Sequence, residues 1–351
     1  MQTSALNELR NGDERRWPQI AAAEIRSSEK LQELATLVGD LLPTDEGSAV
    51  VFGSMARGEF TGGSDLDWTV LIDGRADSLH HKTVHQLSKR LTEAEFIKPG
   101  PTGVFGGLIF SHDLVHAVGG DEDTNKNMTR RLLLLLESRA VQAASGEAVR
   151  ARIISAILSR YVEEDASFIR SNPRADKIPR FLLNDVVRFW RTMAVDYANK
   201  YRARAGDKWA LRNIKLRMSR KLLFVSGFLM CISWALREGS SEEGEFVTQD
   251  LVNHLKTWTD TTPLESLAAT IASHAPDLAA QIFDSYEAFL TLLNDKEKRE
   301  WLEKLSPDAA YGDDVFLQAR STALSFDEAL TQLLFDVNND VTKLVKKYGI
   351  F

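Results

Sequence analysis

Cysteine is almost absent from this chain of 351 residues, which contains only Cys231. A single cysteine excludes an internal disulfide and any metal site built from several thiolates. Because Cys231 lies in the apolar run 224–236, we expect an unreactive thiol in the core. Such low cysteine usage is typical of a reducing compartment, so we expect a cytoplasmic protein.

Long hydrophobic runs and an excess of positive charge are missing as well. No apolar stretch reaches about eighteen residues, and residues 1–15 lack the apolar region of a signal peptide, so we expect no membrane span. The 43 basic and 50 acidic residues give a net charge of −7, which excludes a global field that would attract nucleic acid. The hydrophobic content of 44% is typical of a soluble globular protein, and the chain is long enough for two domains.

The most informative segment combines a Gly-Ser turn with two aspartates. One apolar run ends at Gly53 and Ser54, and a second apolar run begins with Asp65 and Asp67. Side chains alternate across a strand, so the two aspartates are expected on one face and their apolar neighbours on the other.

These residue types suit a metal and a phosphate. Two neighbouring carboxylates repel each other unless a cation lies between them, and such oxygen ligands bind Mg²⁺ or Mn²⁺. The backbone N–H groups of the turn and the Ser54 hydroxyl suit a phosphate. We therefore expect Gly53 and Ser54 to hold a nucleoside triphosphate, which Asp65 and Asp67 contact through the metal.

Two further residues of this segment are candidates for nucleotide binding. Ser64 is expected to cap the turn beside the aspartates. Arg57 either supports the loop and neutralises phosphate or forms a structural salt bridge to Glu59 or Asp73.

Gly-Ser followed by Ser-Asp-x-Asp at this spacing resembles the DNA polymerase beta-like nucleotidyltransferase superfamily. The stretches 57–60 and 64–67 are most similar to the uridylyltransferases that modify PII nitrogen-signalling proteins and to their stand-alone relatives, and residues 130–139 are similar to a helix of those proteins. The resemblance implies that Asp65 and Asp67 bind metal during transfer of a nucleoside monophosphate.

Members of this superfamily usually carry a third carboxylate on a later strand, as general base or metal ligand. The corresponding strand candidate, 104–110, contains no acid. Asp113 is the nearest candidate for this catalytic role, followed by Asp121, Asp123 and Glu137.

The pattern along the chain predicts an α/β (α+β) domain with a small mixed sheet, followed by an all-α domain. We expect a nucleotidyltransferase domain over residues 1–147 and, over 148–351, a helical domain that completes the nucleotide cleft. Strands are predicted at 48–52, 66–72 and 104–110. Helices are predicted at 17–42, 81–94, from 111 to the Gly119-Gly120 pair, 129–144, 151–170, 179–203, 207–237, 246–258, 263–273, 276–293, 296–304 and 326–348.

A local basic segment interrupts this acidic chain. Residues 202–221 contain eight Lys or Arg and one acid. At about 100° per residue, helical spacing aligns Lys208, Arg212, Lys215 and Ser219 in one stripe, and a preceding helix aligns Asn184, Arg188 and Arg191. Such stripes suit a triphosphate, an RNA or other acidic partner, or structural salt bridges.

Several functions agree with these features. The first is metal-dependent transfer of a nucleoside monophosphate from an NTP to a protein or nucleic-acid hydroxyl, with release of pyrophosphate. The second is an oligonucleotide or cyclic dinucleotide synthase of bacterial defence. The third is a catalytically inactive nucleotide-sensing protein.

Overall fold

The computed structural model describes residues 4–13, 15–39, 41–42, 45–100, 103–116, 118–142, 145–171, 177–203, 208–237, 248–336 and 339–349. The chain forms two compact units. We call residues 23–175 and 243–262 the sheet unit, and residues 1–22, 176–242 and 263–351 the helical unit.

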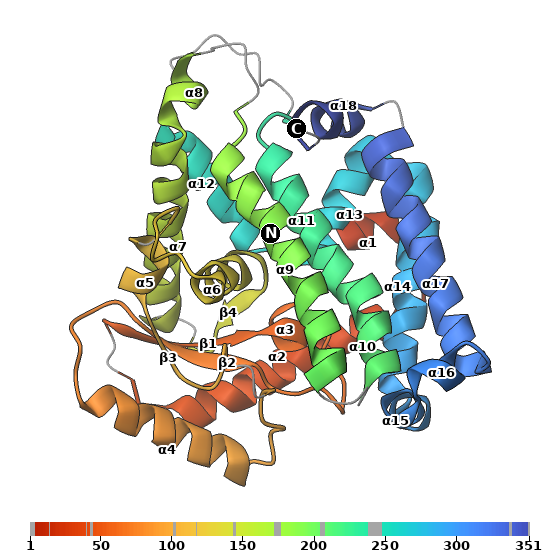
Figure 1. Ribbon diagram of the computed structural model, residues 1–351, viewed down its shortest axis with the longest axis horizontal. Coiled ribbons are helices and arrows are strands. Elements are labelled where there is room, and N and C mark those ends of the chain that lie inside the picture. Colours follow the sequence, from red (N-terminus) through yellow and green to blue (C-terminus); the bar gives the residue numbers. More distant parts are fainter. Residues whose placement is uncertain are drawn as a thin grey trace. The chain divides into compact units, whose positions relative to one another are not determined.

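The sheet unit contains the predicted small mixed sheet, with strand order β3-β2-β1-β4 (Figure 1). β1 (Gly47–Phe52) pairs antiparallel with both β2 (Trp68–Ile72) and β4 (Ser138–Ala140). β3 (Leu108–Phe110) pairs parallel with β2. The Gly-Ser turn after β1, the start of β2 and the loop before β3 therefore meet at the same end of the sheet.

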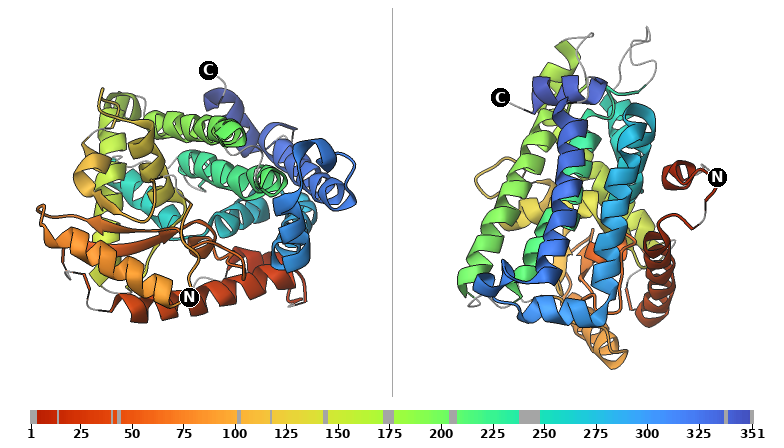
Figure 2. Two further views of the ribbon diagram at one scale, coloured as in Figure 1. Left: turned by 60° about the horizontal axis from the view of Figure 1, so that its bottom comes forward. Right: turned by 90° about the vertical axis from the view of Figure 1, so that its right-hand side faces the viewer.

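One face of the sheet packs against two amphipathic helices. α2 (Pro18–Val38) and α4 (Leu79–Glu93) run along this face (Figures 1 and 2). The core here combines Leu34 and Val38 of α2 with Leu87 and Leu91 of α4 and with inward residues of the strands. Those strand residues are Ala49, Val51, Trp68, Val70 and Ile72.

The opposite face is covered by α6 (Asn125–Leu136) and α7 (Ser145–Glu164). All five leucines of 132–136 are buried, as expected for a block that is apolar on every side. The predicted helix 129–144 is wrong at its C-terminal end, because Ser138–Ala140 form β4. The backbone of this short segment pairs with the edge of β1, which outweighs its local helical pattern.

The division of the chain differs from the expected boundary at residue 147. α7, α8 (Ala166–Ser171) and α12 (Thr248–Thr259) are grouped with the sheet. Arg150 of α7 explains part of this grouping, since its Nε donates to Ser138 Oγ (3.0 Å) and its Nη2 donates to the Thr259 carbonyl oxygen (2.7 Å). The assignment of residues 148–351 to one functional domain stays a prediction.

The helical unit is built around α11 (Lys221–Ile232), whose side chains are largely buried. α11 packs against α9 (Arg180–Ala203) and α13 (Pro263–His274), and α14 (Ala279–Asn294) packs against α17 (Asp314–Thr331). The segment predicted as one helix over 326–348 consists of the end of α17, a π-helical turn at Gln332–Asp336 and α18 (Asp340–Tyr348). Other helical segments are α1 (Ala5–Leu9), α10 (Trp209–Lys215), a π-helical turn at Leu216–Arg220, a 3₁₀ turn at Pro276–Leu278, α15 (Lys296–Lys304) and α16 (Pro307–Ala310).

Among the described residues, none of the helices combines the length and the apolar character that crossing a membrane requires.

Candidate functional site

The Gly-Ser turn lies directly against Asp67. The register of β1 and β2 places Phe52 opposite Asp67, and the Phe52 N–H donates to the Asp67 carbonyl oxygen at 2.8 Å. Gly53 follows with φ +65°, and a Cβ on it would lie 3.0 Å from Asp67 Oδ2. Glycine is therefore required twice, for the left-handed backbone and for the space that the carboxylate occupies. Ser54 is half-buried in the short helix α3 (Gly53–Ala56) that begins here.

The two aspartates precede β2 and keep the alternation of an extended chain. Asp65 is exposed and Asp67 is half-buried, whereas Leu66 and Trp68 are buried in the core on the α2 and α4 side. Both carboxylates therefore lie on the opposite side of the chain from that core, as the alternation predicted.

Ser64 closes the turn just before the aspartates. Its Oγ accepts a hydrogen bond from the Thr61 N–H at 3.0 Å, and the Thr61 and Ser64 hydroxyl oxygens are 3.1 Å apart. The expected cap is thus formed within residues 61–64. Contact of Ser64 with a nucleotide stays a prediction.

Arg57 forms a buried ion-pair network. Its Nε and Nη2 both lie 2.8 Å from Glu59 Oε2, and its Nη1 contacts Glu137. All three side chains are at most 5% exposed. Of the two roles considered for Arg57, the salt bridge to Glu59 is the one that the described contacts support. Asp73, the other candidate partner, pairs instead with Arg152.

An aromatic residue lies near the aspartate end of the sheet. The regular pairing of β3 with β2 ends in a bulge, because the N–H of Gly106, a residue with φ +77°, donates to the Trp68 carbonyl oxygen at 2.7 Å, one position out of the β3 register. Phe105 precedes this bulge. Its half-buried ring packs 5.4 Å from the ring of Phe52.

The candidates for the third carboxylate have other environments. Asp113 is exposed in α5 (Ser111–Val115), which follows β3 at the end of the sheet opposite Asp67 (Figure 1). Asp123 forms a bidentate ion pair with the fully buried Arg131, at 2.9 and 2.8 Å. Glu137 pairs with Arg57, and Asp121 is exposed. Within the described residues, no group of three His, Cys, Asp or Glu side chains could hold a metal ion.

The two predicted polar stripes, Lys208 to Ser219 and Asn184 to Arg191, belong to the helical unit, and several of their members have partners there. Lys208 Nζ lies 2.9 Å from Glu303 Oε2, Arg188 Nη1 lies 3.8 Å from Asp185 Oδ1, and the Ser219 hydroxyl donates to the Lys215 carbonyl oxygen at 3.2 Å. Asn184 is exposed, and Arg212 and Lys215 are half-buried. Their contact with a triphosphate stays a prediction.

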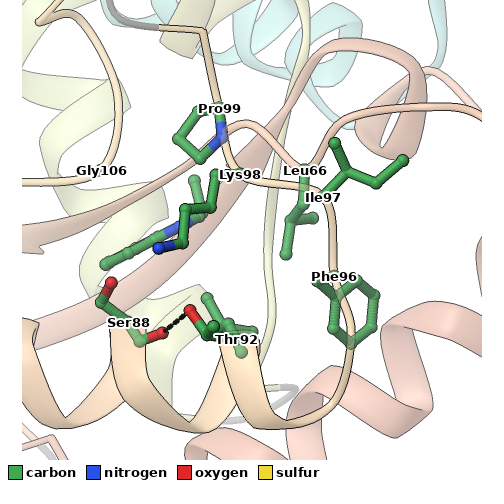
Figure 3. A pocket seen from close by; sticks show the side chains of 10 residues that line it. Leu66, Ser88, Thr92, Phe96, Ile97, Lys98, Pro99 and Gly106 are labelled. Atoms are coloured by element: carbon green, nitrogen blue, oxygen red, sulfur yellow. Dashed lines mark hydrogen bonds between the residues drawn. The ribbon is translucent and has the colours of Figure 1, made fainter.

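A cavity of about 190 Å³ lies on the other side of the chain from the aspartates. Leu66 and Trp68 line it together with residues of α4 and of the segment 96–99 (Figure 3). Polar and apolar atoms contribute almost equally to its walls, and the Thr92 hydroxyl that lines it already donates to the Ser88 carbonyl oxygen at 2.8 Å. Because Leu66 and Trp68 face away from Asp65 and Asp67, this cavity is separate from the paired carboxylates.

The paired carboxylates fit a hard divalent cation. Asp67 supplies a half-buried carboxylate beside a turn that has no side chain at Gly53, and Asp65 supplies an exposed one. Mg²⁺ typically takes one or two protein carboxylates and completes its shell with water and substrate phosphate oxygens.

Comparison with known families gives a match that covers the segment of the Gly-Ser turn and the aspartates. Residues 31–99 match the family model described as a nucleotidyltransferase domain, which is consistent with the DNA polymerase beta-like superfamily. The matched region runs from the second half of α2 to the segment before β3 and includes Gly53, Ser54 and both aspartates. Among curated proteins, no significant match was found.

Proposed function

We propose that this chain, whose residues 31–99 form a nucleotidyltransferase domain, transfers a nucleoside monophosphate from an NTP to a hydroxyl and releases pyrophosphate. The observation that carries the proposal is the contact geometry of Gly53 and Asp67. A carboxylate oxygen of Asp67 lies 3.0 Å from the position that a Cβ on Gly53 would take, at the end of β1 where the Gly-Ser turn begins.

In the proposed mechanism, each residue of the site acts mainly by position and charge. The backbone N–H groups at Gly53 and the Ser54 hydroxyl bind the β- and γ-phosphates, which orients pyrophosphate as the leaving group. Asp65 and Asp67 would hold Mg²⁺ or Mn²⁺. When bound there, the cation neutralises phosphate charge and lowers the pKa of the attacking hydroxyl.

Arg57 contributes to this site as a structural residue in the proposal. It connects the end of α3 to Glu59 and to Glu137 at the end of α6. Because the network is buried, it restricts the turn that carries Gly53 and Ser54. The uridylyltransferase-like motif supports a protein hydroxyl as acceptor.

A second candidate function is nucleotide sensing without chemistry. The segment 104–110 beside β2 supports it, because this segment contains no carboxylate that could act as a general base or bind a metal.

One experiment tests both candidates. The chain is incubated with each α-³²P-labelled NTP and Mg²⁺ or Mn²⁺, alone and with the RNA and protein fractions of a lysate, while pyrophosphate is measured. We expect labelled product and stoichiometric pyrophosphate with the wild type and with Glu93→Gln, an exposed carboxylate on α4. Asp65→Asn/Asp67→Asn should lose roughly 100-fold or more of the rate. An inactive wild type that is still stabilised by NTP would favour the sensor.

A further inference from the structure

The loop before β3 contacts an aromatic side chain at the aspartate end of the sheet and basic side chains of α6. Gly106 and Gly107 hydrogen-bond to Trp68 and Val70 of β2, so the loop lies beside the start of that strand. The Thr69 hydroxyl also donates to the Gly107 carbonyl oxygen at 2.8 Å. Phe105 packs its half-buried ring against the buried ring of Phe52, whose backbone N–H donates to the Asp67 carbonyl oxygen.

Two cations of α6 meet at Gly103 in the same loop. Arg130 Nη2 lies 3.4 Å from the Gly103 carbonyl oxygen, and Lys126 Nζ lies 4.0 Å from the position that a Cβ on Gly103 would take. These residues are four positions apart, so they are neighbours on one side of the helix and repel each other. The arrangement gathers positive charge around a residue that has no side chain.

The surroundings of Arg130 compensate its charge only partly. Its Nε is buried without a hydrogen-bond partner among the described residues. Burial lowers the pKa of Arg130, and the nearby exposed Asp113 opposes this effect. An anion at Gly103 would relieve the repulsion between the two cations.

The strand order indicates that the acceptor binds on the side of the loop before β3. β2 lies between β1 and β3, so the Gly-Ser turn and the loop flank the aspartates from opposite sides. In phosphoryl transfer, the attacking and leaving oxygens lie roughly in line on opposite sides of the phosphorus. If the turn holds the leaving pyrophosphate, the acceptor approaches from the loop.

We propose that Phe105, Lys126 and Arg130 form a binding site for a single-stranded nucleic acid, in which Phe105 stacks on a base and the two cations contact its phosphates. The combination of an aromatic surface with a basic groove is the usual means of binding single strands without reading their sequence. The role of this strand as acceptor rests on the function proposed above, whereas its binding does not.

The test is binding of a fluorescein-labelled single-stranded 12-nucleotide RNA of mixed sequence to the full chain, followed by anisotropy at several salt concentrations. For single strands, each phosphate contact contributes about −0.7 to the slope of log K against log salt. Lys126→Ala/Arg130→Ala should therefore reduce the magnitude of the slope by about 1.4. Phe105→Leu should weaken binding by roughly 5- to 150-fold with little change in slope.

A matched control removes the same charge from the other face of the sheet. Lys82 and Lys89 are exposed on α4, and Lys82→Ala/Lys89→Ala should leave affinity and slope close to wild type. Circular dichroism and thermal unfolding establish that each variant is folded. The proposal would be overturned if the wild type did not bind RNA. It would also be overturned if the control variant lost as much RNA affinity as the Lys126→Ala/Arg130→Ala variant.

The outcome is separable from that of the transfer assay. If RNA binding depends on these residues but no labelled product forms, the proposed activity is contradicted and the binding site is supported. If protein is labelled but RNA does not bind, the nucleic-acid site is contradicted and the transferase activity is supported.

Discussion

Glu137 accepts a hydrogen bond from Nη1 of Arg57, although 80 positions separate the two residues in the sequence. The contact joins the helix after the Gly-Ser turn to the junction of α6 and β4. The same guanidinium contacts Glu59, so one buried cation faces two buried carboxylates.

This excess of carboxylates predicts an asymmetric response to mutation. Arg57→Met removes the cation that both glutamates contact, and loss of one member of a buried ion pair costs about 3–5 kcal/mol. Glu137→Gln leaves Arg57 with Glu59 and should cost only about 1–2 kcal/mol. Urea unfolding of the two variants and the wild type measures both values. Equal losses in the free energy of unfolding for the two variants would contradict the assignment of Arg57 as the cation that both glutamates share.

Gly53 should be far less tolerant of a methyl group than a glycine of the adjacent turn. Gly53→Ala places a Cβ 3.0 Å from Asp67 Oδ2 in a backbone with φ +65°, and we expect a loss of about 1–2 kcal/mol in the free energy of unfolding. Gly62→Ala, which meets no atom within 4 Å, should change it by at most about 0.5 kcal/mol. Urea unfolding of both variants gives the comparison. A Gly53→Ala variant as stable as Gly62→Ala would show that Asp67 does not lie against the turn.

Binding of metal and nucleotide should stabilise the chain only when the aspartates are intact. At a ligand concentration 100 times the Kd, the expected gain is about 2.7 kcal/mol. We expect this gain for the wild type with Mg²⁺ and a non-hydrolysable NTP analogue, and its loss in Asp65→Asn/Asp67→Asn. Thermal unfolding with and without EDTA provides the measurement. If Mg²⁺ and the analogue together stabilised the double variant as much as the wild type, the two aspartates would not be metal ligands.

The parts of the fold that were predictable from the sequence are those determined by local pattern. The alternation around Asp65 and Asp67 and the glycine of the turn follow from rules that act over a few residues. The buried leucine block at 132–136 was predictable in the same way, because its apolar side chains leave no polar face.

Contacts set by the pairing of distant strands could not be predicted in this way. The contact of Phe105 with Phe52 depends on the order and pairing of the strands, which no local pattern encodes. The strand at 138–140 continues a helical pattern in the sequence and forms only because the edge of β1 is available. Glu137 lies between α6 and this strand, so its ion pair with Arg57 could not be predicted from the sequence either.

Cys231 offers a test of the helical unit. Its side chain is fully buried in α11, and burial raises the pKa of the thiol well above its ordinary value. Since Cys231 is the only cysteine in the chain, reaction with a thiol reagent at pH 8 should follow unfolding of the native state. Complete labelling within seconds, under conditions where circular dichroism shows a folded chain, would contradict this burial.

The same pKa predicts how stability depends on pH. In the unfolded chain the thiol ionises at about pH 8.5, whereas in the folded chain it stays protonated. Above that pH the unfolded state binds fewer protons than the native state, so this group should lower the free energy of unfolding by about 1.4 kcal/mol per pH unit. Cys231→Ala removes the thiol, and the small cavity it leaves costs the same at every pH. The difference in the free energy of unfolding between wild type and Cys231→Ala, measured in urea from pH 7 to 10, should therefore be constant up to about pH 8.5 and then change in favour of the variant. A difference that stays constant to pH 10 would mean that the thiol ionises equally in both states.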